Sequence, residues 1–257
     1  VTDRAGAGLL AGSRRLDDEA TAQRLASVAP APSDTIRFDA TGDGRWVWRT
    51  GAHDAATVVV LLPGVGSDLG DAARLHGDAE SLRAVLAVEL DRRGLDPDDA
   101  AVVSWLGYDP PDLLPGGLDP RPARSGAAQL TVDVGALRSG GAGRVVVVGH
   151  SYGGLVASLA AASGLAADDV VLLGAPGVGH GVTARSGGPR RWAAAAAGDP
   201  ISLLARLGLV HGADPLAGAT RLPTSRSGHS SYLGDPVLLR ALGGVVLCGG
   251  ARSTVLS

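Results

Sequence analysis

Residues 145–153 read VVVVGHSYG, and this short stretch decides the fold. Four consecutive valines are typical of a central strand in a parallel sheet, which is buried on both faces. The residues from Tyr152 to Ala162 carry apolar side chains at helical spacing. Between strand and helix, residues 149–153 match the pattern G-x-S-x-G. The sequence therefore predicts a sharp strand-to-helix turn with Ser151 at its apex.

The chemistry of this turn depends on where its serine points. A serine hydroxyl can attack a carbonyl only if it projects from the backbone, and a sharp turn provides that projection. The turn also brings the backbone close together two residues before and two after the serine, where glycine fits because it has no Cβ. The bare pentapeptide arises by chance in a chain with 39 glycines. Its setting between a strand and a helix nevertheless favours Ser151 as a nucleophile.

Apolar runs and helical segments alternate along the rest of the chain, which is typical of a parallel sheet with right-handed crossovers. We expect an α/β fold with a mostly parallel sheet and helices on both faces. Further strands are expected at residues 57–62, 101–105, 170–173, 192–197 and 219–222, and an antiparallel pair at 35–38 and 45–49. Helices are expected from Asp78, as N-cap, to a stop at Gly94, and from about 122 to 137.

A serine nucleophile needs an acid and a base, which follow it in the chain in that order. Asp199 comes directly after an expected strand, where a carboxylate can orient an imidazole. The alternative is that Asp199 only caps the helix that follows it. His229 lies beyond the last expected strand, so we favour it over His211 as the base. His150, inside the turn, is expected to pack behind it.

The oxyanion hole of such a site pairs the amide after the nucleophile with an amide from the loop after an earlier strand. Here these amides belong to Tyr152 and Val65. A competing interpretation of residues 64–70 is a dinucleotide-binding fingerprint. Its third glycine comes one position late, and no strand carries the acidic residue expected about 20 positions further on. We therefore expect neither a nucleotide nor any other organic cofactor.

Composition excludes several classes of function. The net charge of −3 and the pI near 6.1 offer no electrostatic basis for binding nucleic acid. Cys248 is the only cysteine, which excludes an internal disulfide and a cysteine-based metal cluster; we expect it to be a small buried apolar residue, and no metal is expected. The sequence contains no run of about 18 apolar residues, so it predicts no membrane span. The charged N-terminus lacks a signal peptide, so a cytoplasmic location is expected, although the missing initiator methionine leaves upstream sequence open.

The domain organisation is expected to be simple. Residues 1–34 are small, polar and charged and end in the run Ala29–Pro32, APAP. We interpret them as an arm or linker and residues 35–257 as one domain. The sequence does not indicate an oligomeric state.

Six segments together resemble an actinobacterial α/β-hydrolase family. The resemblance covers about residues 40 to 235 and rests on residues 63–66 (PGVG), 104–111 (SWLGYDPP), 147–153 (VVGHSYG), 174–177 (GAPG), 196–200 (AAGDP) and 228–232 (GHSSY). It implies the α/β-hydrolase fold, with Ser151, Asp199 and His229 at the positions of that family's triad. It also places Tyr108 and Asp109 in a substrate-binding loop at the carboxyl edge of the sheet.

These patterns predict a serine hydrolase that cleaves a small-molecule carboxylic ester by a Ser-His-Asp triad, through an acyl-enzyme. One alternative is an acyltransferase that uses the same triad with an alcohol in place of water. The other is a binding domain that keeps the fold without its chemistry. The acyl chain length and the natural substrate cannot be predicted from the sequence.

Overall fold

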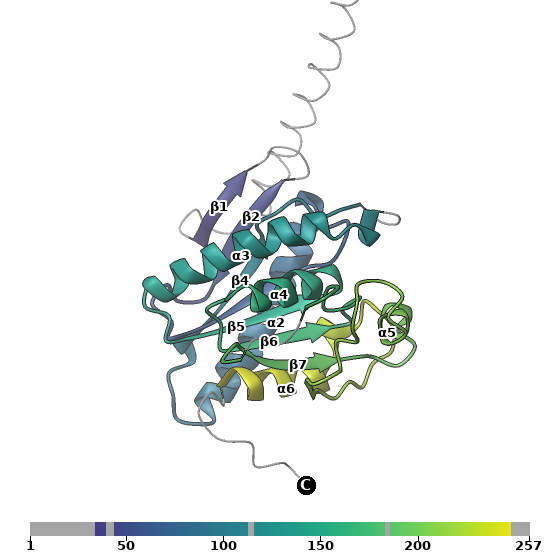
Figure 1. Cartoon of the computed structure of the whole chain (residues 1–257). Coiled ribbons are helices and arrows are strands. Elements are labelled where there is room, and N and C mark those ends of the chain that lie inside the picture. Colours follow the sequence, from purple (N-terminus) through teal and green to yellow (C-terminus); the bar gives the residue numbers. More distant parts are fainter. Residues whose placement is uncertain (1–33, 40–43, 113–115, 183–185, 248–257) are drawn as a thin grey trace, which may run out of the picture.

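A single sheet of eight strands organises the chain (Figure 1). The structure, a computed structural model, describes residues 34–39, 44–112, 116–182 and 186–247. Across the sheet the strands follow the order β1 (Thr35–Asp39), β2 (Arg45–Thr50), β4 (Ala100–Leu106), β3 (Thr57–Leu62), β5 (Arg144–His150), β6 (Asp169–Leu173), β7 (Arg190–Ala194) and β8 (Thr220–Arg221). All neighbours from β4 to β8 are parallel, and only β2 runs antiparallel to both of its neighbours. The expected mostly parallel sheet is confirmed.

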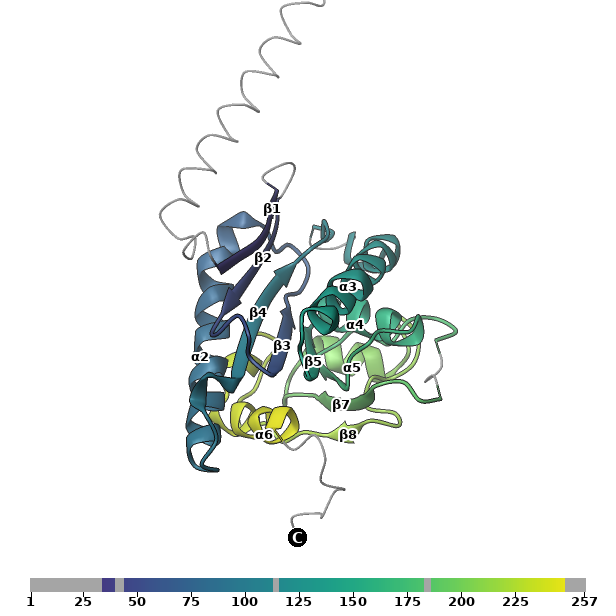
Figure 2. The same cartoon turned by 90° about the vertical axis from the view of Figure 1, so that its left-hand side faces the viewer.

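Helices cover both faces of this sheet (Figure 2). On one face lie α2 (Ala72–Asp91) and α6 (Pro236–Leu247), and on the other lie α3 (Arg121–Ser139) and α4 (Tyr152–Ala162). The short helix α5 (Pro200–Arg206) follows β7. Four 3₁₀ turns complete the described elements: η2 (Leu69–Asp71), η3 (Pro97–Asp99), η4 (Gly116–Leu118) and η5 (Tyr232–Gly234).

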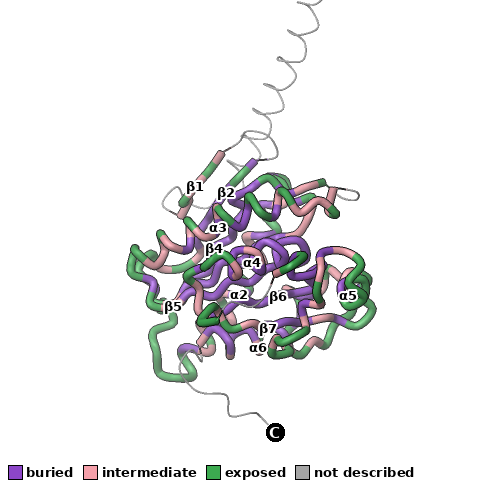
Figure 3. The backbone as a smooth tube through the Cα atoms, in the orientation of Figure 1, coloured by how far each residue is buried: buried purple, intermediate pink, exposed green. Residues whose placement is uncertain are grey.

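Burial follows this layered arrangement (Figure 3). Every residue of β4 and β6 is buried, as expected of strands covered on both faces. On one side the core contains Leu130 of α3 and Leu155 of α4, and on the other it contains Leu86 of α2 and Leu242 of α6. In the described part of the chain, no helix is both long and apolar enough to cross a membrane.

One helix boundary was predicted wrongly. Helix α2 begins at Ala72 with Asp71 at its N-cap, so Asp78 lies inside the helix. The reason is that its buried face starts earlier, with Leu75 and Ala79 ahead of Leu82. The Asp78 carboxylate instead accepts a hydrogen bond from Arg74, one turn before it, at 3.4 Å.

Two other predictions fall on residues that the structure does not describe. The arm at 1–34 lies outside the described residues except for Asp34, and Cys248 also lies outside them. Both stay predictions.

Candidate active site

Ser151 sits on a strained turn between β5 and α4. Its backbone has φ 53° and ψ −124°, and among the described residues it is the only non-glycine with positive φ. Such a conformation persists only where the surrounding structure enforces it. Neighbouring glycines allow it: a Cβ on Gly149 would collide with the carbonyl of Gly153, and a Cβ on Gly153 with that of Pro63. The expected need for glycine two residues before and after the serine is confirmed.

A continuous hydrogen-bonded chain runs from this serine to a buried carboxylate. The Ser151 Oγ lies 2.8 Å from Nε2 of His229, and Nδ1 of His229 lies 2.9 Å from Oδ1 of Asp199. Because a carboxylate can only accept, Nδ1 carries the proton and Nε2 is free to accept from the serine. Asp199 follows β7 and His229 follows β8, so the ends of three different strands bring the residues together.

Asp199 caps a helix and orients the histidine at the same time. Its Oδ1 accepts from the backbone N–H of Ile201 and Ser202 at the start of α5, at 2.9 and 3.3 Å. Its Oδ2 accepts from the hydroxyls of Ser202 and Tyr232, at 2.8 and 2.5 Å. Burial works to raise the pKa of Asp199, but the hydrogen bonds from His229, Tyr232 and Ser202 outweigh it and hold the pKa well below its usual range. The carboxylate is therefore charged at neutral pH.

Two residues support this chain that sequence reasoning did not assign to it. The His150 Nε2–H donates to the backbone carbonyl of His229 at 2.8 Å, and the two rings lie 4.9 Å apart. Burial, and then the neighbouring His229, lower the pKa of His150 to about 4, so it is neutral at pH 7. Tyr232 donates to Asp199 and accepts from the Ala196 N–H at 2.9 Å. The signals for Tyr232 were its place three residues after His229 and its inclusion in the segment 228–232 that carries the family resemblance.

The loop after β3 passes directly over the serine. A Cβ on Gly64 would lie only 2.9 Å from the Ser151 Cβ, so glycine is required there. The Gly66 N–H holds the loop by donating to the Pro111 carbonyl at 3.0 Å. Outside helices and strands, the amides of Val65 and Tyr152 donate to no backbone carbonyl of a described residue. Neither amide is therefore engaged by the backbone, and their role as an oxyanion hole stays a prediction.

A cavity of about 460 Å³ adjoins these groups, and Ser151, His150, His229 and Val65 line it. Its outer wall includes Arg74 and Asp78. Arg74 is exposed and pairs with Asp71 at 3.0 Å and with Asp78 at 3.4 Å. Burial raises the pKa of Asp78, although Arg74 acts in the opposite direction. In the described ranges, no three His, Cys, Asp or Glu side chains group as a metal site would require.

The structure does not bring every proposed site residue to this cavity. His211 is buried, and its Nε2–H donates to the Gly117 carbonyl at 2.7 Å. Tyr108 is buried against Trp105, with ring centroids 5.8 Å apart, and burial raises the pKa of its unpartnered hydroxyl. Neither Tyr108 nor the exposed Asp109 lines the cavity at Ser151. The loop after β4 thus reaches the carboxyl edge of the sheet but turns Tyr108 into the core.

Sequence relatives come from mycobacteria. The chain is 35% identical over 192 residues to the uncharacterized protein Rv2079 of Mycobacterium tuberculosis (strain ATCC 25618 / H37Rv), an overlap of 69% of this chain and 29% of that protein. It is 37% identical over 158 residues to the uncharacterized protein Mb0988c of Mycobacterium bovis, an overlap of 60% of this chain and 56% of that protein. The chain thus spans under two thirds of each relative.

Solved structures and a family model give the same fold. Protein TT1662 of Thermus thermophilus superposes with a TM-score of 0.51 at 17% identity, over 84% of this chain and 99% of that one. Protein Atu2452 of Agrobacterium tumefaciens, of unknown function, superposes with a TM-score of 0.50 at 18% identity, over 79% and 95%. At these identities the likeness shows the fold alone. A family model described as alpha/beta hydrolase matches residues 39–209, and the chain belongs to that family.

Proposed function

We propose that the chain is a serine hydrolase that cleaves a carboxylic ester through an acyl-enzyme on Ser151. One observation carries the proposal: the unbroken hydrogen-bonded chain from Ser151 through His229 to Asp199 ends at a cavity large enough for a small ligand. Family membership supports hydrolysis as the type of reaction but does not identify a substrate.

In the acylation step, the Ser151 hydroxyl gives its proton to Nε2 of His229 as Oγ bonds to the ester carbonyl carbon. The negative charge that forms on the carbonyl oxygen is stabilised by the N–H groups of Val65 and Tyr152. Asp199 stabilises the imidazolium that forms and keeps its tautomer. The bond to the alkoxy oxygen then breaks as His229 donates its Nε2 proton to that oxygen, which leaves as the alcohol.

In the deacylation step, water takes the place of the alcohol. His229 accepts a proton from the water as its oxygen bonds to the acyl carbon, and a second tetrahedral intermediate forms. Its collapse breaks the bond to Oγ, returns the proton to Ser151 and releases the carboxylic acid. An alcohol in place of this water would give the acyltransferase reaction.

A fluorophosphonate probe tests the proposal, because its phosphorus reacts only with an activated serine and loses fluoride. We expect the probe to label the wild-type chain on Ser151 and not to label Ser151→Ala. The matched control is Ser230→Ala, since Ser230 lines the same cavity but its hydroxyl forms no hydrogen bond with Ser151, His229 or Asp199. Labelling retained in Ser151→Ala, or absent from the wild type, would refute the proposal.

A panel of p-nitrophenyl esters, from acetate to decanoate, then tests the substrate class. We expect saturable turnover with a preferred acyl length, together with release of the free acid. Added glycerol separates the two acyl acceptors, because an acyltransferase would form the glyceryl ester in place of the acid. Labelling of Ser151 without turnover of any ester would contradict ester cleavage but retain the nucleophile.

A further inference from the structure

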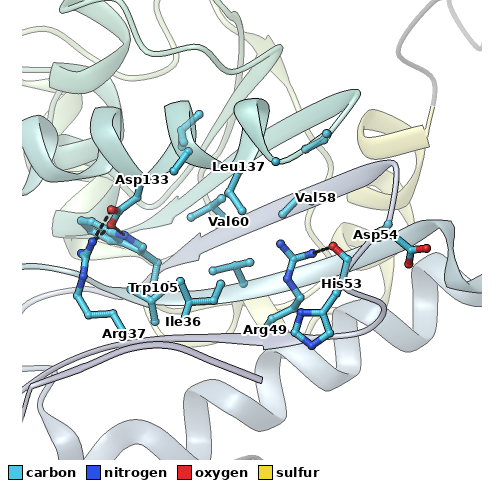
Figure 4. Close-up of a pocket in the computed structure, with 18 residues that line it drawn as sticks. Ile36, Arg37, Arg49, His53, Asp54, Val58, Val60, Trp105, Asp133 and Leu137 are labelled. Atoms are coloured by element: carbon cyan, nitrogen blue, oxygen red, sulfur yellow. Dashed lines mark hydrogen bonds and ion pairs between the residues drawn. The ribbon is translucent and has the colours of Figure 1, made fainter. Parts of the chain in front are cut away.

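A second cavity lies on the face of the sheet that α3 covers, beside β1 and β2, and no triad residue lines it. Its volume is about 360 Å³, and it lies between β1 and β2 on one side and the end of α3 on the other (Figure 4). Val58 lines it at the amino end of β3, and Ala142 lines it just before β5. Ser151, in contrast, follows the carboxyl end of β5. The two cavities share no lining residue.

Most of this second cavity is apolar, and at one of its two polar ends the charged groups are paired with each other. The apolar wall consists of Val47, Val58, Val60, Val103, Val134 and Leu137. At one end Arg37 binds both oxygens of Asp133, at 2.9 and 2.7 Å. The indole N–H of Trp105 donates to the same carboxylate at 2.8 Å. The charges of Arg37 and Asp133 neutralise each other, so this end has no free charge to bind a charged ligand.

The other polar end holds a buried cation without a counter-charge. Arg49 of β2 is only 8% exposed, and its guanidinium points between the sheet and α3 (Figure 4). One terminal nitrogen, Nη1, donates to the carbonyls of Ala52 and His53 at 3.2 and 3.3 Å. Among the described residues, no carboxylate forms an ion pair with Arg49, and its Nε and Nη2 have no hydrogen-bond partner in the protein. The exposed Asp54 turns its carboxylate away (Figure 4).

Burying a charge without a partner is costly, so this arrangement favours an anion. Burial alone already lowers the pKa of Arg49. The open side of its guanidinium carries two N–H groups in the fork that matches a carboxylate. The other arginine lining the cavity is occupied, since Arg37 pairs with Asp133, and Nε2 of His53 lies 3.5 Å from the Asp34 carboxylate. One free guanidinium matches a single negative charge.

We propose that this cavity binds an amphiphilic monocarboxylate. The ligand's carboxylate lies against Nε and Nη2 of Arg49, and its apolar tail lies along the valines and Leu137. Binding requires no reaction at Ser151, so the proposal is independent of the chemistry at the triad.

Titration calorimetry with sodium decanoate at pH 7, below its micelle concentration, tests the proposal on the full chain. We expect saturable binding to the wild type that weakens at least about tenfold in Arg49→Met, since a charge-assisted hydrogen-bonded pair is lost. The matched control is Arg74→Met, because Arg74 is the arginine that lines the triad cavity. This variant should bind decanoate within about twofold of the wild type.

A second variant keeps the test decisive if Arg49→Met fails to fold. Leu137→Trp fills the cavity without removing the guanidinium, and we expect it to abolish binding while its melting temperature stays near that of the wild type. Three results would overturn the proposal: no saturable binding to the wild type, unchanged binding in both Arg49→Met and Leu137→Trp, or a loss in Arg74→Met that equals the loss in Arg49→Met.

Discussion

The cavity beside Ser151 and the cavity beside Arg49 have similar volumes, about 460 and 360 Å³, but different chemistry. In the first, polar groups from three strand ends converge: Asp199 orients His229, and His229 accepts a hydrogen bond from Ser151. In the second, a single guanidinium faces a wall of valines and a leucine. Size alone therefore does not distinguish a reaction site from a binding site, whereas the connection between polar groups does.

The difference follows from the topology of the sheet. Residues at the carboxyl ends of parallel strands come together at one edge, where ligands of open α/β sheets bind. β2 runs antiparallel to β4 and places Arg49 opposite Val103, in the middle of β4, whereas Ser151 follows the carboxyl end of β5. A reversed strand thus carries a charged side chain to a cavity that none of Ser151, His229 and Asp199 lines.

The largest expected effect separates the two cavities directly. Ser151→Ala should lower ester turnover on the order of 10⁶-fold, the scale of loss when the serine of a protease triad is removed. Arg49→Met should leave turnover within about twofold, because the two cavities share no lining residue. Initial rates with one p-nitrophenyl ester measure both. Turnover above about a tenth of wild type in Ser151→Ala would exclude it as the nucleophile.

Much of the carboxyl edge could be predicted because its signals are local. A run of four valines identifies β5, and the pentapeptide after it requires glycine for backbone reasons that hold in any protein. The choice of His229 over His211 used only chain order, and the structure places His229 beside Ser151 and His211 against Gly117. Such features need no knowledge of which helices pack together.

Features that depend on tertiary packing could not be predicted. Tyr108 follows the end of β4, but whether it faces the ligand or the core depends on Gly126 of α3, whose missing side chain leaves room for the ring. The hydrogen bond from Tyr232 to Asp199 and the ring contact between His150 and His229 join segments far apart in the chain. The cavity at Arg49 likewise combines residues of β1, β2, β3, β4 and α3.

A smaller effect is expected at the acid of the triad. Asp199→Asn keeps an oxygen for the helix cap, and asparagine caps about as well as aspartate, so the melting temperature should change little. Turnover should fall about 10⁴-fold, the loss that the same change causes in a serine protease. The reason is that asparagine favours the wrong tautomer of His229, in which Nε2 carries the proton and cannot accept from Ser151. Melting and kinetics on one preparation check both results. Turnover within about threefold of wild type would leave Asp199 as a cap alone, and Asp214 would become the next candidate acid.

A comparison of two buried tyrosines tests whether the hydroxyl of Tyr232 supports the triad. Tyr232→Phe removes a donor to Asp199, so we expect kcat to fall roughly tenfold with little change in KM. Tyr152→Phe is the matched control, because that hydroxyl also accepts a backbone N–H, from Ala123 at 3.1 Å, but lies apart from Asp199. Both variants should lose about 1 kcal/mol of stability. Equal kcat values in the two variants would show that Tyr232 is only structural.

The smallest expected effect concerns Asp235, which holds the segment carrying His229. Its carboxylate accepts from the Ser225 hydroxyl and N–H, both at 2.6 Å, from Arg226 N–H at 2.9 Å and from Val237 N–H at 2.9 Å. Burial works to raise the pKa of Asp235, but these hydrogen bonds outweigh it and hold the pKa below its usual range. A lowered pKa in the folded state stabilises the fold above the unfolded value of about 3.9, and this contribution is lost as the pH falls further.

Asp235→Asn should therefore lower the free energy of unfolding by about 1 to 2 kcal/mol at pH 6, where the wild-type carboxylate is charged. The gap between variant and wild type should narrow as the pH falls from 4 to 3, because the wild type then begins to lose the advantage of its charge. Urea unfolding at pH 6, 4 and 3 measures the gap at each step. A gap that stays constant over this range would mean that the Asp235 charge does not contribute to holding the His229 segment, and that its hydrogen bonds act only through their geometry.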